Sequence, residues 1–284
     1  MNNRTAFLWL LLFLTSPFLY AKKACIIVHG TWASQESWYR SGGSFFEAVL
    51  ATSARHGVDE VVSFTWSGKN SDRERRKAAV ALSAIIEKYD DVVIIAHSHG
   101  ANVAIMASQM IDNDSAWNYN RHQLYKISKF YALGVPVQAY ECFPNMNVIN
   151  YFYNLFSFED FVQPVFGIFG RTFFIHERVA NISAFIDNQQ PDHSGLHHPI
   201  IGKSILNIHE NLMHCGCSIN KNCGCFDRNH FAFKQPIKIF FHTVECHNLI
   251  CKADHERENL LKKDQKLMRL LLDAIMRKPK NRRN

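Results

Sequence analysis

The chain has 284 residues, enough for one large domain with a substantial core. Its 47% hydrophobic and 20% charged residues exclude disorder over most of its length. Its net charge of +7 is uneven, because residues 252–284 hold eleven Lys and Arg against five Asp and Glu, which leaves +1 for the rest. A nearly neutral body argues against a nucleic-acid enzyme, whereas a basic tail can attract an anionic membrane surface or nucleic acid.

Residues 1–21 are typical of an export signal. Arg4 supplies a positive charge, an apolar run extends from Ala6 to Tyr20, and Ala21 offers a cleavage site. The run is short for a membrane-spanning helix and contains Pro17. We therefore expect a cleaved signal peptide and a protein exported to the periplasm, the cell envelope or the medium. An uncleaved anchor and a buried helix are the alternatives.

Beyond residue 21, apolar runs typical of buried strands alternate with helical patterns. Strands are expected at 24–28, 61–66, 92–96, 127–137, 148–155 and 179–186. One helix is expected after Ser44, which forms a capping box with Glu47, and it ends at Gly57. Others are expected after Ser71 and from Ser98 to about residue 111. This alternation predicts a mostly parallel sheet with helices on both faces.

The most informative segment is Val93–Val103, in which an apolar strand leads through Ser98 directly into a helix. So sharp a turn strains the serine backbone and requires small neighbours two positions away, which Ala96 and Gly100 provide. Ser98 is therefore the predicted nucleophile. Acylation of a serine also needs donors for the oxyanion, and the N–H of His99, at the start of the helix, is the first candidate.

The loop that follows the first strand is expected to supply the second oxyanion donor. Gly30 lets this loop pass close to Ser98, so that the N–H of Thr31 or Trp32 points inward. His97, just before the serine, is interpreted as a structural or pocket-lining residue.

With these motifs the chain resembles the α/β-hydrolase superfamily, in particular its esterases and lipase-like members. The resemblance covers roughly residues 24–213 and includes the His29-Gly30 turn, the elbow at Ser98, and an acid and a histidine that follow in the superfamily's order. It implies the α/β-hydrolase fold, a Ser-His-Asp triad and two-step acyl transfer without a metal or organic cofactor.

The resemblance places the acid after a strand that follows the elbow, and the histidine in the loop before the closing helix. Asp160 fits the acid, with Glu159 as its competitor. His193 fits the base, with His197 and His198 as alternatives, and Pro199 suits the first turn of a helix at 200–212.

The expected function is cleavage of carboxylic esters. The alternatives with the same triad are an acyltransferase, a thioesterase or an amidase, and a further one is a catalytically silent hydrolase fold that binds a ligand in the cell envelope. Ten Phe and Tyr residues lie between Tyr151 and Phe174, and they indicate either core packing or an apolar wall for a lipidic substrate.

The segment after the predicted hydrolase domain (22–213) divides into a Cys-rich extension (214–251) and a basic helical tail (252–284). The extension holds six of the eight cysteines, namely Cys215, Cys217, Cys223, Cys225, Cys246 and Cys251. Export predicts disulfides among them, with a metal site or free thiols as alternatives. Cys25 and Cys142 are expected to be buried or half-buried. The tail is expected to pack on the body or to lie on a membrane surface.

Overall fold

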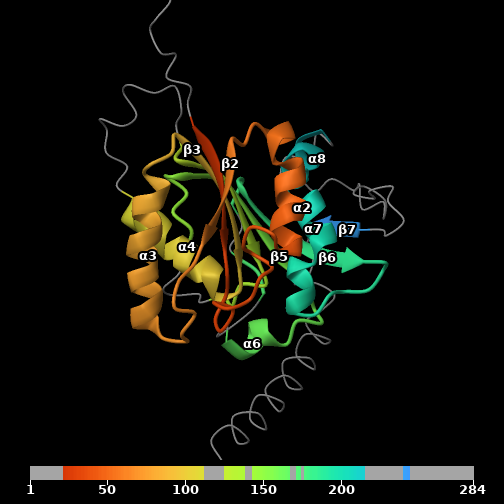
Figure 1. Cartoon of the computed structure of the whole chain (residues 1–284). Helices are drawn as coiled ribbons and strands as arrows, with labels where there is room; N and C mark the ends of the chain where they lie inside the picture. The colour runs from red at the N-terminus through yellow and green to blue at the C-terminus, as the bar shows by residue number, and fades with distance from the viewer. Residues whose placement is uncertain are drawn as a thin grey trace, which may run out of the picture.

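The structure is a computed structural model that describes residues 22–111, 125–137, 143–166, 171–173, 176–214 and 239–243. Within these residues, seven strands form one central sheet (Figure 1). The strands are β1(Lys23–Val28), β2(Glu60–Phe64), β3(Asp91–His97), β4(Ile127–Leu133), β5(Ile149–Phe156), β6(Val179–Ile186) and β7(Ile239–Thr243). Their spatial order is β2-β1-β3-β4-β5-β6-β7. The first six are parallel, and β7 pairs antiparallel with β6 at the edge.

Helices cover both faces of the sheet (Figure 1). They are α2(Ser44–Ser53), α3(Asp72–Ile86), α4(His99–Met110), α6(Val162–Phe166), α7(Pro199–Ile205) and α8(Ile208–His214), with short 3₁₀ helices at Ala54–His56 and Ser194–His197. Helices α3 and α4 pack on one face, and α2, α7 and α8 pack on the other. Alternate residues of β1 show why its apolar run is continuous, since Ile26 packs toward α3 and α4 while Ile27 packs toward the opposite helices.

The predicted parallel sheet with flanking helices is confirmed, and the ends of the strands differ by a few residues from those expected. The predicted helix at 200–212 is two helices, separated at residues 206–207. It begins at Pro199 as expected, and Gly57, with φ 66°, ends the turn that follows α2.

The predicted capping box at Ser44 is wrong. Gly43 occupies the N-cap of α2, and Ser44 is already the first helical residue. A Cβ on Gly43 would lie 1.9 Å from the carbonyl oxygen of Ser37, so the tight approach of the preceding loop requires glycine at the cap. Glu47 still reaches back, and its carboxylate accepts a hydrogen bond of 2.7 Å from the Gly42 N–H.

Strand β7 lies inside the segment expected to be a Cys-rich extension. The sheet therefore continues beyond residue 213, where the sequence analysis had placed the end of the hydrolase domain. The run Ile239-Phe240-Phe241 has the β-branched and aromatic residues typical of a strand, although it lies within a cysteine-rich part of the sequence. The predicted signal, Cys142, the six later cysteines and the basic tail lie outside the described residues.

Cys25 is buried in β1, as expected, and burial raises the pKa of its thiol to about 12. None of the helices in the described ranges combines the length and the apolar character needed to cross a membrane.

The order of the strands determines where a site can form. From β1 the chain moves to one side of the sheet to form β2 and then returns to the other side to form β3. The loops that leave β1 and β3 therefore diverge at the carboxyl edge of the sheet, and such a switch point is the usual ligand crevice of an open parallel sheet. Thr31, Trp32 and Ser98 all lie in these two connections.

Candidate active site

Ser98 occupies a strained turn between β3 and α4. Its φ of 54° and ψ of −135° lie outside the regions that non-glycine residues ordinarily adopt, a conformation that costs on the order of 1–3 kcal/mol. A hydrogen bond to the neighbouring strand β4 holds the turn, because the Ser98 N–H donates to the Leu133 carbonyl at 2.8 Å. The serine is only 5% exposed. The sequence predicted this elbow from the strand, the serine and the small neighbours alone.

Close packing explains the glycines around the elbow. A Cβ on Gly100 would lie 2.3 Å from the carbonyl oxygen of His29, and a Cβ on Gly30 would lie 2.7 Å from the Cβ of Ser98. The loop after β1 therefore passes directly against the elbow, as the sequence analysis expected for Gly30. Neither position can accept a side chain without a shift of the backbone that holds the serine.

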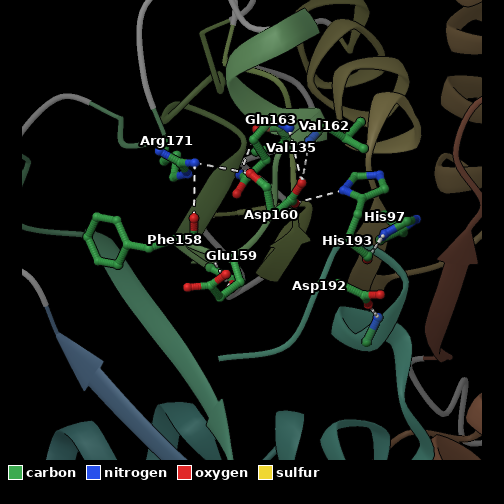
Figure 2. Close-up of polar contacts among 12 residues, drawn as sticks. His97, Val135, Phe158, Glu159, Asp160, Val162, Gln163, Arg171, Asp192 and His193 are labelled. Atoms are coloured by element: carbon green, nitrogen blue, oxygen red, sulfur yellow. Dashed lines mark hydrogen bonds and ion pairs between the residues drawn. The ribbon is translucent and has the colours of Figure 1, made fainter. Parts of the chain in front are cut away.

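Asp160 and His193 form the central polar contact of the site (Figure 2). The Nδ1 of His193 lies 2.7 Å from Oδ2 of Asp160, and the carboxylate is fully buried. The other oxygen, Oδ1, accepts the N–H groups of Val162 and Gln163 at 2.8 and 3.1 Å. Glu159, the competing acid, is exposed and does not contact His193. One carboxylate therefore orients the imidazole and caps the start of α6.

The loop that carries Asp160 is braced on both sides (Figure 2). Arg171 Nη2 donates to the carbonyl oxygens of Asp160 and Phe158 at 3.1 and 3.2 Å. The side-chain amide of Gln163 donates to the Val135 carbonyl at 3.0 Å. These bonds tie the acid to the loop after β4, so its position does not depend on His193 alone.

The three candidate histidines of the closing loop have different roles. His193 bonds to Asp160, whereas the His197 ring stacks on Trp38 with a centroid distance of 4.3 Å and an interplanar angle of 9°. His198 caps α7 by accepting the N–H of Ile200 at 3.3 Å. Burial, as the largest cause, lowers the pKa of His197. Geometry thus separates His193 from its two neighbours, which sequence spacing could not do.

His97 links the elbow to the loop of His193. Its Nε2 donates to the His193 carbonyl at 2.9 Å, and the two rings lie 4.5 Å apart. Burial, together with the neighbouring His193 and His197, holds the pKa of His97 well below its ordinary value, so the ring stays neutral. His97 is therefore a buried structural residue that positions the loop, one of the two roles expected for it.

Gly134, which the sequence analysis did not single out, lies between the acid and the histidine. Its φ is 60°, and an added Cβ would lie 3.0 Å from Asp160 Oδ2 and 3.2 Å from His193 Nδ1. The preceding residue, Leu133, accepts the Ser98 N–H. All three candidate residues therefore meet at the end of β4. No hydrogen bond joins Ser98 Oγ to His193 among these described residues, and such contacts often tighten only when substrate binds.

The two loops provide backbone donors beside Ser98. The His99 N–H opens α4 and so has no carbonyl of its own helix to bind. The Trp32 N–H donates to the Gly68 carbonyl at 2.8 Å, whereas the Thr31 N–H has no acceptor in the described part of the chain. Because the Trp32 N–H is already engaged, His99 and Thr31 are the better candidates for the two oxyanion donors.

His29 fixes the shape of the donor loop. Its Nδ1 donates to the Gly30 carbonyl at 2.8 Å, its Nε2 accepts the Trp66 N–H at 3.1 Å, and its own carbonyl accepts the Trp66 indole N–H at 2.8 Å. Burial, as the largest cause, lowers the pKa of His29, which is consistent with the neutral ring that these bonds require. The loop is thus preorganised before any substrate arrives.

The parallel sheet, the order of its strands and the strained turn after β3 define the α/β-hydrolase fold. The model of the alpha/beta hydrolase family matches residues 25–180, more than half of the chain, so the chain belongs to this family. None of the curated proteins matches the sequence.

Solved structures with a similar arrangement include hydrolases of low sequence identity. A cutinase-like protein from Cryptococcus sp. is 10% identical, with 69% of this chain and 96% of that chain covered and a TM-score of 0.38. The metagenomic carboxyl esterase is 11% identical, with 52% and 55% covered and a TM-score of 0.29. A protein of Xanthomonas campestris pv. campestris assigned to the alpha/beta hydrolase superfamily is 12% identical, with 66% and 99% covered and a TM-score of 0.42. These similarities are too remote to carry an argument about activity.

Proposed function

We propose that the protein is a serine hydrolase that cleaves carboxylic esters through an acyl-enzyme intermediate. The observation that carries the proposal is the 2.7 Å contact between His193 and a fully buried Asp160, at the same corner of the sheet as the strained Ser98. A buried carboxylate on one imidazole nitrogen leaves the other nitrogen to act as a base.

The proposed mechanism has two acyl-transfer steps. His193 Nε2 takes the proton of Ser98 Oγ as that oxygen attacks the ester carbonyl, and Asp160 stabilises the imidazolium that forms. The N–H groups of His99 and Thr31 stabilise the oxyanion. The imidazolium then protonates the leaving alcohol. Water attacks the acyl-enzyme by the same route, which frees Ser98 and returns its proton.

Exposed aromatic residues near the site support an ester with an apolar portion. Trp32, in the donor loop, is 69% exposed and lies edge-on to Phe166 with a centroid distance of 6.2 Å. Phe158 and Phe161, on either side of the acid, are also exposed. By contrast, other aromatic residues between Tyr151 and Phe174 are buried, namely Phe152, Tyr153, Phe156 and Phe173. The aromatic segment thus divides into core and surface, and its surface part lies beside Asp160.

The proposal is tested with the purified protein and a panel of p-nitrophenyl esters of increasing acyl length. We expect turnover of at least one chain length and its loss in Ser98→Ala. Acyl lengths that fit the exposed aromatic residues should show a lower KM, because apolar contact adds about 0.8 kcal/mol for each buried methylene. Failure of the whole panel, with folded protein confirmed by circular dichroism, would contradict the proposal.

A further inference from the structure

Arg75, near the start of α3, is a buried cation that has no carboxylate partner among the described residues. It is 7% exposed, its Nη1 donates to Asn70 Oδ1 at 3.0 Å, and its Nε is buried without an acceptor in the described part of the chain. The acids next to it in sequence pair elsewhere, Asp72 with Arg76 and Glu74 with Lys77. A buried charge is normally paired, because its desolvation is costly, so this guanidinium requires an explanation.

The side chain of His99 presents a second donor without an acceptor. Its Nδ1 accepts a hydrogen bond of 3.1 Å from the Asn102 amide, which places the ring proton on Nε2. This Nε2 is buried and has no hydrogen-bond partner in the ranges that the structure describes, and the residue is 3% exposed. Burial and, after it, the charge of Arg75 lower the pKa of His99 to about 4. At neutral pH the ring is therefore an uncharged donor.

The fold brings these two groups to the nucleophile. Helices α3 and α4 follow the parallel strands β2 and β3, so both begin at the carboxyl edge of the sheet, and they pack on the same face (Figure 1). His99 directly follows Ser98 and is the first residue of α4, and Arg75 is the fourth residue of α3, the helix that packs against α4. Phe166 lies edge-on to His99, with a centroid distance of 6.0 Å.

We propose that Arg75 and the His99 side chain form a subsite for an anionic oxygen group of the substrate, a carboxylate or a phosphate carried a few bonds from the scissile carbonyl. The inference rests on the proposed function, since it locates the anion relative to Ser98. Two N–H donors without acceptors, one of them charged, are complementary to an anionic oxygen and cannot satisfy each other. The anion would also neutralise the buried charge.

Two substrates of matched shape test the subsite. The p-nitrophenyl monoester of glutarate ends in a carboxylate, and p-nitrophenyl valerate ends in a methyl group at the same position. We expect Arg75→Met to lower the ratio of kcat/KM values, glutarate ester over valerate ester, by about tenfold to a hundredfold, the value of a hydrogen bond to a charged group. Arg75→Lys should fall between, because it keeps the charge and loses the guanidinium fork.

Arg76→Met is the matched control, since Arg76 lies on the same helix but is exposed and paired with Asp72. Its ratio should equal that of the wild type. A second pair, oleoyl glycerol phosphate against monooleoyl glycerol, distinguishes a lipid phosphate from a soluble carboxylate as the source of the anion. If Arg75→Met changes the ratio in neither pair, the proposal is overturned. An equal loss on charged and neutral esters, with a lower melting temperature, would make Arg75 a structural residue and also overturn it.

A binding measurement distinguishes failure of this inference from failure of the proposed function. Calorimetric titration of glutarate and of glycerol phosphate into Ser98→Ala needs no turnover. We expect at least one of them to bind Ser98→Ala and to bind about tenfold or more weakly to Ser98→Ala/Arg75→Met. If the wild type cleaves no ester while this difference is found, the hydrolase proposal fails and the subsite stands. Equal binding to the two variants, or binding to neither, overturns the subsite.

Discussion

Asp160 contacts the His193 ring through one carboxylate oxygen and caps the start of α6 with the other. Oδ2 lies 2.7 Å from the imidazole, while Oδ1 accepts two backbone N–H groups. The orientation of the His193 imidazole is therefore coupled to the local fold of the loop that carries Asp160. Substitutions of Asp160 should separate these two roles.

Asp160→Asn should lower ester turnover by about 10⁴-fold, because the amide cannot stabilise an imidazolium and favours the wrong tautomer of His193. The contribution of the helix cap to the free energy of unfolding should change little, since Asn caps a helix as well as Asp does. Asp160→Ala should lose turnover to a similar extent and also about 1 kcal/mol of unfolding free energy. Kinetics and denaturant unfolding measure the two effects. Glu159→Gln is the control, and a comparable rate loss there would show that the acid has been misassigned.

Substitution of each histidine in the closing loop tests the choice of base. His193→Ala should lower turnover by about 10⁴- to 10⁶-fold. His197→Ala should keep most of the turnover and lose about 0.5–1.5 kcal/mol of stability with its stack on Trp38. His198→Ala should also keep most of the turnover, because its contact is a helix cap. An inactive His198→Ala with an active His193→Ala would reverse the assignment.

Gly134→Ala should disturb the contact between acid and histidine sterically. Its Cβ would lie 3.0 Å from Asp160 Oδ2, at a φ of 60°. We expect the rate to fall by about 10²-fold as this geometry shifts, and stability to fall by about 1–2 kcal/mol. Gly57→Ala is a matched control, since its φ is 66° but no atom lies within 4 Å of an added Cβ. It should show the stability loss without the rate loss, and equal rate losses in both variants would contradict the account.

The buried histidines predict that stability falls at acid pH. The pKa of His99 is lowered from 6.5 to about 4, and that of His97 is also lowered, so below pH 6.5 protons bind preferentially to the unfolded chain. The stability from His99 is complete above pH 6.5 and is lost as the pH falls toward 4, at up to about 1.4 kcal/mol per pH unit. His99→Gln should reduce this slope in denaturant unfolding measured from pH 7 to pH 4.5. A slope equal to that of the wild type would contradict the burial of a neutral His99.

Local sequence patterns were sufficient for much of this fold. The continuous apolar runs predicted six strands, and the strand, the small residues and the helix around Ser98 predicted the elbow, because all of these signals lie within a few residues of one another. Asp160 and His193 emerged from the order of motifs along the chain. Both lie where their loops were expected, and the structure brings them into contact.

Features that depend on distant contacts could not be predicted in this way. Gly134 matters because of atoms 26 and 59 residues further along the chain, at Asp160 and His193. The glycine cap of α2 depends on a preceding loop, and β7 is recognised as a strand of this sheet only through its pairing with β6. Arg75 is one of several basic residues near the start of α3, and within the described residues only its burial without a carboxylate partner distinguishes it.

The most direct test of the central claim is labelling of the purified protein with a fluorophosphonate probe, which reacts covalently with an activated serine. The wild type should be labelled at Ser98, as identified by peptide mass spectrometry, and Ser98→Ala should not be labelled. His193→Ala should be labelled far more slowly, because the base that activates the hydroxyl is gone. Equal labelling of the wild type and Ser98→Ala would contradict the account.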